Sequence, residues 1–347
     1  MHPQFGRLMT EATALTRAGD LKAAMAAIAT ALHNGPAETA QAPHAAEGVI
    51  DVEARVIPDD AAPVAPSSQD VEQFIAGRFA HRAGTRDYKL FIPTPRDDTP
   101  RSLIVMLHGC TQNADDFAKG TRMNVLGAAH NALVLYPEQT RQANAQGCWN
   151  WFKHNHQERG RGEPALLADM ARHIAQSHGV DPARVYVAGL SAGGAMAAIL
   201  ASTYPDVFAA AGVHSGLPAG AARDLPGALA AMQGQRGGGA ATQSGSNVRM
   251  IVFHGDADTV VHPSNGERVA QSHAGNAASV DEERSIQVGT RSCTRRLHKD
   301  AQGQVLTEQW LVHGAGHAWS GGNPAGSYAD QRGPDASAEM VRFFLAK

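Results

Sequence analysis

The sequence predicts an α/β fold with a mostly parallel, doubly wound sheet over residues 76–347. Short, continuous apolar runs recur along this region, as expected for strands that are buried on both faces. Helical patterns lie between them, and this alternation is typical of a parallel sheet covered by helices. The runs cover residues 103–107, 132–136, 185–188, 209–213 and 250–253, and the clearest helices cover 164–178, 192–204 and 336–346.

Two segments of this region depart from the alternation. Residues 79–82 and 88–92 predict an opening β-hairpin that turns at Ala83 and Gly84. Residues 216–247 are rich in glycine, glutamine and serine and show no sustained period. We expect this second segment to be a mobile insertion on the surface.

The first 75 residues differ in composition from the rest of the chain. Residues 1–34 contain two short stretches of helical periodicity separated at Gly19, which predicts a helical hairpin with one narrow apolar stripe. Residues 35–75 are rich in alanine, proline and acidic residues and predict a flexible linker. A hairpin with so little to bury is expected to dock on something else: the main domain, which is the favoured interpretation, a second copy of the chain, giving a homo-oligomer, or a hydrophobic surface.

Composition excludes several classes of function. The 347 residues carry a formal net charge of −3, so the chain lacks the basic field that nucleic acids attract. Apolar stretches are interrupted before 18 residues, which predicts no membrane span. The N-terminus has no apolar signal-peptide core, so we expect a cytoplasmic protein. Three cysteines leave room for one disulfide at most, and a reducing cytosol makes a structural disulfide less favoured.

The chain also lacks the patterns of common cofactor sites. Seventeen histidines raise the question of a metal, and His154 and His156 stand beside Glu158. No further ligand follows at a metal-binding spacing, so we expect no metal. No phosphate-binding glycine motif opens a helix, so we expect no nucleotide and no other cofactor.

The most informative motif is Gly-x-Ser-x-Gly around Ser191. An apolar strand leads into Gly189-Leu190-Ser191-Ala192-Gly193, and an alanine-rich helix follows at once. Small residues allow the sharp turn that lifts a serine hydroxyl above the sheet edge, at the positive end of a helix. We therefore expect Ser191 to be a nucleophile.

A nucleophilic serine needs a histidine base and an orienting acid, which follow it in that order in this kind of fold. Asp258 and Asp256 both follow the apolar run 250–253, and the deeper position in the loop favours Asp258 as the acid. His317 lies among small residues after another apolar strand and is the favoured base. The rival histidines are His214, His254, His262 and His313.

Acyl transfer also needs two backbone N–H groups that stabilise the oxyanion. The first is the N–H of Ala192, directly after the serine. The second is expected in the segment Leu107-His108-Gly109-Cys110-Thr111-Gln112, where Cys110 is the first choice and Thr111 the second. His108 is expected to be structural rather than catalytic.

Taken together, five segments resemble the poly(3-hydroxybutyrate) depolymerase family of esterases, which includes feruloyl and acetylxylan esterases. These segments are 107–112, 147–152, 189–194, 254–258 and 314–322. The resemblance implies an α/β-hydrolase fold and ester hydrolysis by Ser191, Asp258 and His317, with Cys110 and Ala192 as oxyanion donors. It also implies a polyester granule as the hydrophobic surface for the hairpin.

Three questions stay open at this stage. Trp149, Trp151 and Trp319 are expected to wall the substrate pocket, because aromatic side chains in loops beside a nucleophile suit an apolar ester. Cys110 and Cys148 either form a disulfide or stay free, whereas Cys293 is expected to be unpaired. The preferred substrate is a 3-hydroxybutyrate polymer or oligomer, with a feruloyl or acetylxylan ester as the alternative and a non-catalytic scaffold as the least favoured hypothesis.

Overall fold

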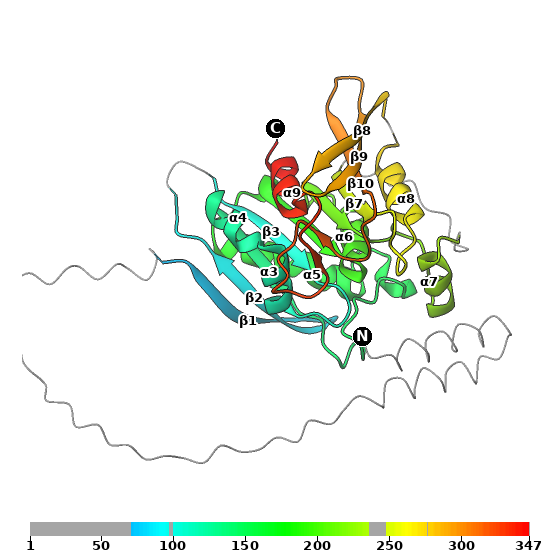
Figure 1. The fold of residues 1–347 in the computed structure, drawn as a ribbon. Coiled ribbons are helices and arrows are strands. Elements are labelled where there is room, and N and C mark those ends of the chain that lie inside the picture. The colour runs from blue at the N-terminus through cyan, green and yellow to red at the C-terminus, as the bar shows by residue number, and fades with distance from the viewer. Residues whose placement is uncertain (1–70, 97–99, 236–247, 276, 347) are drawn as a thin grey trace, which may run out of the picture. The chain divides into compact units, whose positions relative to one another are not determined.

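The computed structural model describes residues 71–346 apart from 97–99, 236–247 and 276 (Figure 1). The expected helical hairpin (1–34) and almost all of the expected linker (35–75) lie outside these residues. The predicted end of the linker at residue 75 is wrong, because strand β1 already begins at Gln73 and pairs there with Ile92. Sequence alone missed these first strand residues because most of β1 is exposed, none of it is buried, and it shows little apolar patterning.

Within the described residues, ten strands form one mixed sheet in the order β1-β2-β4-β3-β5-β6-β7-β10-β9-β8. The six central strands, from β4 to β10 in this order, run parallel, and the strands at both ends are antiparallel. Their bounds are β1 Gln73–His81, β2 Gly84–Ile92, β3 Ser102–Leu107, β4 Ala132–Pro137, β5 Val185–Leu190, β6 Ala210–His214, β7 Arg249–Gly255, β8 Ser279–Val288, β9 Arg291–Lys299 and β10 Val305–Val312. A small parallel pair, β11 (Trp319–Ser320) and β12 (Ala329–Asp330), lies apart from this sheet.

Helices cover both faces of the sheet. One core contains side chains of α5, α6, α7 and α8, and the other contains side chains of α3, α4 and α9. The bounds are α3 Ala114–Thr121, α4 Met123–Ala129, α5 Gly162–Ser177, α6 Ala192–Thr203, α7 Leu225–Met232, α8 Ser264–His273 and α9 Ala336–Leu345, with 3-10 turns at His154–His156 and Pro182–Arg184.

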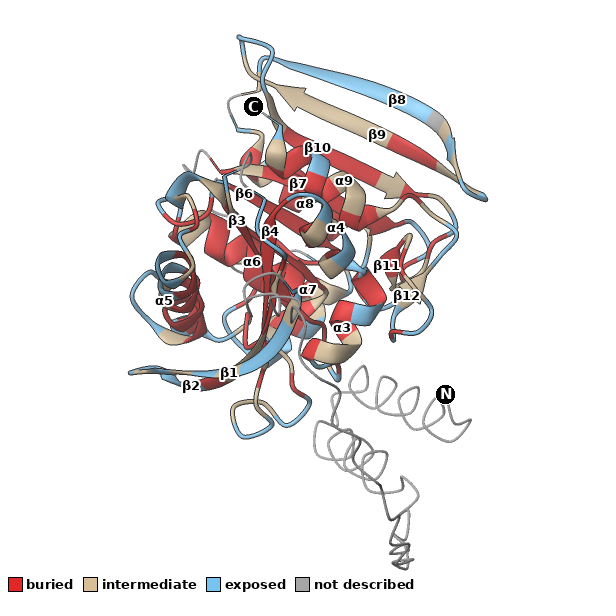
Figure 2. Ribbon diagram, turned by 90° about the vertical axis from the view of Figure 1, so that its left-hand side faces the viewer, coloured by how far each residue is buried: buried red, intermediate tan, exposed pale blue. Residues whose placement is uncertain are grey.

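Alternation along the central strands builds these two cores. In β3, Leu103, Val105 and Leu107 join the core with α5 and α6, while Ile104 and Met106 join the core with α3 and α9. All of these side chains are buried, and Figure 2 shows the central strands as the buried middle of the molecule. The predicted doubly wound sheet is therefore confirmed.

The edges of the sheet were harder to foresee. The strands β8 and β9 form a long hairpin at one end, and Figure 2 shows β8 largely exposed. Residues 216–247, expected as a surface insertion, contain helix α7 in their described part. The sequence did not predict α7, because two of its leucines, Leu225 and Leu229, are exposed and its apolar residues do not lie on one buried face.

The parallel strands set the position of the candidate site. Side chains that follow the carboxyl ends of β3, β5, β6, β7 and β10 share one edge of the sheet, which is where open α/β sheets bind ligands. Among the described helices, none is both long and apolar enough to cross a membrane.

Candidate active site

Ser191 occupies a strained turn between β5 and α6. Its backbone angles are φ 56° and ψ −118°, a conformation that non-glycine residues seldom adopt. Its N–H donates to the carbonyl of His214 at the end of β6 over 2.9 Å. A Cβ added to Gly193 would lie 2.0 Å from the carbonyl oxygen of Leu107, so glycine is required where the helix meets β3. These contacts hold a partly exposed serine above the sheet edge.

Asp258 and His317 form a hydrogen-bonded pair at the same edge. Asp258 follows β7, His317 follows β10, and Asp258 Oδ2 lies 2.8 Å from His317 Nδ1. The second oxygen, Oδ1, accepts hydrogen bonds from the N–H groups of Val260 and Val261, each over 2.9 Å. The carboxylate is buried and leaves the outer nitrogen of the imidazole, Nε2, free of this contact.

The environment of Asp258 favours its charged form. Burial opposes the charge, but the nearby His254 ring and hydrogen bonds from His317 and the Val261 N–H outweigh it and hold the pKa of Asp258 well below its usual range. His254 Nε2 lies 2.8 Å from the Val261 carbonyl and 3.5 Å from Asp258 Oδ2. Its hydrogen bond therefore goes to the carbonyl, and its interaction with the carboxylate is mainly electrostatic.

The competing carboxylate, Asp256, has a different partner. Its Oδ2 lies 2.8 Å from His313 Nδ1, and its Oδ1 accepts from the Gly314 N–H over 2.6 Å. The other nitrogen of His313 lies 3.0 Å from the Thr294 hydroxyl. This pair joins two neighbouring loops, and the side chains of both residues are more than one third exposed.

His214 connects the turn of Ser191 with the loop of His317. Its carbonyl accepts from Ser191 N–H, and its Nε2 accepts from Ser320 N–H over 2.9 Å. Burial lowers the pKa of His214 to about 3, and His254 and His317 further disfavour a positive charge there. The neutral ring stacks on Phe253 and Trp319. His214 is thus a buried anchor between both loops.

The expected triad is brought together in part. Asp258 and His317 are paired, and both their loops adjoin the serine turn through His214. Within the described chain, no hydrogen bond joins Ser191 Oγ to His317, although such contacts are often long before substrate binds.

The loop after β3 lies beside Ser191. A Cβ added to Gly109 would lie 3.7 Å from Ser191 Cβ. Thr111 N–H is already bonded to the Gln146 carbonyl over 2.9 Å, whereas the N–H groups of Cys110 and Ala192 have no partner in the described part of the chain. Cys110 and Cys148 form a disulfide, which answers the question left open above. Cys293 is free and buried, as expected.

The three tryptophans expected to wall the substrate pocket are a correction. Trp149 and Trp319 are 0% and 1% exposed, and Trp151 is 5% exposed. Trp149 packs near His108, and Trp319 donates to the Ser337 hydroxyl and packs edge-on against Phe117. Trp149 and Trp151 belong to the core with α5 and α6, and Trp319 belongs to the core with α3 and α9.

Tyr328 is a site residue that sequence reasoning missed. It is 47% exposed, and its ring lies edge-on to His317 with 6.5 Å between the ring centres. Its hydroxyl lies 3.4 Å from Thr111 Oγ1, so it reaches from His317 to the loop after β3. The feature that marks Tyr328 is its positive backbone angle, φ 52°, and this angle is visible only in the structure.

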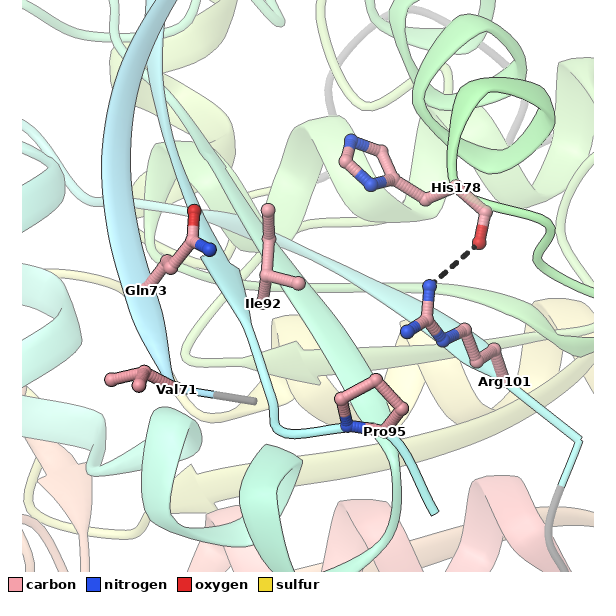
Figure 3. A pocket seen from close by; sticks show the side chains of 6 residues that line it. All are labelled: Val71, Gln73, Ile92, Pro95, Arg101 and His178. Atoms are coloured by element: carbon pink, nitrogen blue, oxygen red, sulfur yellow. Dashed lines mark hydrogen bonds between the residues drawn. The ribbon is translucent and has the colours of Figure 1, made fainter. Parts of the chain in front are cut away.

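A pocket of about 280 Å³ lies away from this edge (Figure 3). Its lining comes from the start of β1, the end of β2 and the residues that flank β3 and α5: Val71, Gln73, Ile92, Pro95, Arg101 and His178. Arg101 precedes β3, so the pocket belongs to the amino end of that strand, whereas the paired Asp258 and His317 follow carboxyl ends. The described residues contain no cluster of three metal-binding side chains.

Comparison with known sequences decides the family. Residues 86–290, more than half of the chain, match the family described as esterase PHB depolymerase. The chain belongs to this esterase family. The resemblance carried by the five sequence segments is thereby confirmed.

Proteins similar to this member of the PHB depolymerase family are named as depolymerases, acetylxylan esterases and feruloyl esterases. The chain is 32% identical over 226 residues to poly(3-hydroxyalkanoate) depolymerase C of Paucimonas lemoignei, covering 62% of this chain and 54% of that protein. It is 30% identical over 208 residues to a probable acetylxylan esterase A of Aspergillus flavus, covering 54% and 65%. It is 29% identical over 246 residues to feruloyl esterase B of Thermothelomyces thermophilus, covering 66% and 82%. The chain thus spans about half to two thirds of the length of the first two.

A solved structure supports the fold. The acetyl xylan esterase from Aspergillus awamori matches with a TM-score of 0.61 and 20% identity, covering 78% of this chain and all of that one. This likeness, with the parallel sheet and its helices, identifies the α/β-hydrolase fold.

Proposed function

We propose that the protein is a serine esterase that hydrolyses carboxylic esters through Ser191, His317 and Asp258. The observation that carries the proposal is the hydrogen bond between His317 and Asp258. It is supported by the strained turn at Ser191 on the same sheet edge and by the chain order serine, acid, histidine that serine hydrolases of this fold use. Asp258 holds the proton of His317 on Nδ1, so Nε2 is the basic nitrogen. This nitrogen takes the proton of Ser191 Oγ as the oxygen attacks the ester carbonyl.

The oxyanion formed by this attack needs two N–H donors. We assign Cys110 and Ala192, because Thr111 N–H is already engaged by Gln146. Ala192 is the first residue of α6, where the helix dipole favours negative charge. A preorganised donor of this kind contributes about 10²–10³-fold to kcat.

The reaction then proceeds in two balanced steps. The tetrahedral intermediate collapses, the bond to the alcohol oxygen breaks, and His317 gives its proton to the departing alcohol. Water attacks the resulting acyl–Ser191 ester with His317 again as the base. Collapse of this second intermediate releases the carboxylic acid and returns the proton to Ser191.

We propose 3-hydroxybutyrate polymer or oligomers as the substrate, on the strength of the family and of the relative named as a depolymerase. The relatives named acetylxylan and feruloyl esterases favour sugar acetyl or feruloyl esters as the alternative. Rates on 3-hydroxybutyrate trimer, methyl ferulate and acetylated xylo-oligosaccharide will separate these classes. A preference above tenfold for either alternative rejects the polyester assignment.

The mechanism is tested at Ser191. A fluorophosphonate label is expected on Ser191, and Ser191→Ala is expected to lose about 10⁴–10⁶-fold in kcat on p-nitrophenyl butyrate. Ser202→Ala is the control, because the Ser202 hydroxyl donates a hydrogen bond to the carbonyl of Ala198 in the same helix. A folded Ser191→Ala protein with more than about 1% of the wild-type rate would reject the mechanism and revive a non-catalytic scaffold.

A further inference from the structure

His108 lies buried beneath the loop that carries Cys110, and its hydrogen bonds determine where its proton sits. It is 1% exposed. Its Nε2 lies 3.1 Å from the backbone nitrogen of Gln139, and its Nδ1 lies 2.7 Å from the carbonyl oxygen of Gly109. A backbone N–H only donates, so Nε2 accepts, and the proton must be on Nδ1, where it is donated to Gly109. Both bonds therefore need one neutral tautomer.

The surroundings of His108 favour the neutral ring. Burial lowers the pKa of His108, and this effect outweighs the opposing influence of the hydrogen bond to Gly109 and of the charges of Glu138 and Asp116. The indole of Trp149 packs 5.5 Å from the imidazole, centre to centre, and limits its rotation. The ring is thus held in one orientation as well as one tautomer.

The Gly109 carbonyl belongs to the same peptide group as the Cys110 N–H. This peptide group is planar and trans, as no cis peptide occurs in the described chain, so its C=O and N–H point in opposite directions. A donor that fixes the carbonyl on one side therefore aims the N–H on the other side. The Cys110 N–H has no partner among the described residues, and its loop adjoins Ser191.

We propose that His108 is a positioning residue that aims the Cys110 N–H at the oxyanion by holding the Gly109 carbonyl. The inference rests on the proposed function, because it needs an oxyanion beside Ser191. His108 does not touch the substrate. It acts through one peptide group.

The acceptor side of His108 is anchored in turn. Gln139, whose N–H binds His108, donates from its side chain to the Cys148 carbonyl over 3.0 Å and to Glu163. The Glu163 carboxylate is 3% exposed and also accepts from Asn150 N–H over 2.7 Å. The Cys110–Cys148 disulfide ties the same two segments covalently. A rigid frame thus transmits its position to the peptide group through His108.

Two substitutions separate this role from simple packing. The amide nitrogen of His108→Asn lies near the place of Nδ1 and can still donate to Gly109, but the acceptor for Gln139 is lost. The amide oxygen of His108→Gln reaches the place of Nε2 and can still accept from Gln139, but the donor to Gly109 is lost. His108→Asn leaves the Gln139 N–H unpaired, and His108→Gln leaves the Gly109 carbonyl with only the long 3.4 Å contact from the Gln112 N–H. Both variants are therefore expected to lower the midpoint of guanidinium unfolding.

The expected result is a difference in kcat without a matching difference in stability. On p-nitrophenyl butyrate, His108→Gln should lose about 10²-fold in kcat with KM within about threefold, because the oxyanion donor is misaimed. His108→Asn should lose less than about tenfold. Equal losses in the two variants, or a larger loss in His108→Asn, would overturn the proposal.

A second measurement does not depend on activity or on folded Gln variants. In protein labelled with ¹⁵N-histidine, the His108 ring nitrogens are assigned by their absence from the His108→Asn spectrum. At pH 7 they should show a neutral ring protonated on Nδ1, and a ring protonated on Nε2 would refute the hydrogen-bond chain. If wild-type protein hydrolyses no ester and Ser191 takes no fluorophosphonate, the proposed function fails and the positioning role fails with it. If wild type is active but the Asn and Gln variants behave alike, only the role of His108 fails.

Discussion

Asp258→Asn tests the assignment of the acid most directly. In the wild type, Oδ1 of Asp258 accepts two backbone N–H groups and Oδ2 accepts His317 Nδ1–H over 2.8 Å. Asparagine has one oxygen, and the two N–H groups of Val260 and Val261 hold it in the place of Oδ1. The amide nitrogen then faces His317, where two donors would meet unless the imidazole moves its proton to Nε2.

That change of tautomer sets the size of the effect. With the proton on Nε2, His317 cannot accept the proton of Ser191, and the attack on the ester loses its base. Loss of the correct tautomer in a serine triad lowers kcat about 10⁴-fold. At about 1.36 kcal/mol per factor of ten, this is about 5.4 kcal/mol of transition-state stabilisation. KM for a soluble ester should change little, because Asp258 is buried away from the substrate.

The matched control is Asp256→Asn in the neighbouring loop. Asp256 is 38% exposed and pairs with His313 rather than with His317. Its substitution should change kcat by less than about tenfold. Both variants are compared on p-nitrophenyl butyrate, with circular dichroism melts to confirm folding. If folded Asp258→Asn keeps more than about 1% of the wild-type kcat, or if Asp256→Asn loses more activity, the assignment of the acid is wrong.

Three other predictions concern the frame of the site. Glu163→Gln should lose about 3–5 kcal/mol of unfolding free energy in a guanidinium titration, because it breaks a buried ion pair with Arg86. The control is Glu158→Gln, which removes an exposed ion pair and should lose at most about 1 kcal/mol in the same titration. Burial opposes the Glu163 charge, but the nearby His156 ring, 3.4 Å away, and hydrogen bonds from Gln139 and Asn150 lower its pKa to about 2 from 4.5. The stabilisation by the Glu163 charge is therefore present above pH 4.5 and declines as pH falls toward 2. The difference in unfolding free energy between wild type and Glu163→Gln should narrow over this range, and a constant difference would contradict this. Gly193→Ala should yield little folded protein in a soluble-expression assay, since its Cβ would lie 2.0 Å from a backbone oxygen, and normal yield and activity would refute that reasoning. Reducing the disulfide, which closes a loop with a sequence separation of 38, should lower unfolding free energy by about 4 kcal/mol, and an unchanged unfolding midpoint in dithiothreitol would count against this.

The central fold could be predicted because its signals are local. Strands such as β3 and β5 are buried on both faces, so six consecutive buried positions stand out in the sequence. The turn at Ser191 demands small neighbours for steric reasons, and this requirement also appears as a short motif. The pairing of His317 with Asp258 rather than Asp256 followed from loop depth, and the hydrogen bonds agree with that choice.

Features that depend on distant packing could not be predicted. A tryptophan in a loop has the same sequence signature whether it lines a pocket or enters the core, and Trp149 enters the core beside His108. The bond between Cys110 and Cys148 depends on two loops that follow different strands. Tyr328 reaches His317 and Thr111 from a segment with no motif of its own.

Backbone strain marks the candidate site independently of any motif. Six non-glycine residues of the described chain have positive φ, and four of them belong to this edge: Thr111, Ser191, Ser215 and Tyr328. Such conformations cost about 1–3 kcal/mol each and persist only where surrounding contacts enforce them. Here the Gln146 carbonyl holds Thr111, and the His214 carbonyl holds Ser191. The free energy stored in these turns is therefore offset by the same buried frame that includes His108 and His214. A site maintained in this way is already formed before substrate arrives, so binding energy from the ester need not be spent on ordering the loops and remains available to stabilise the transition state.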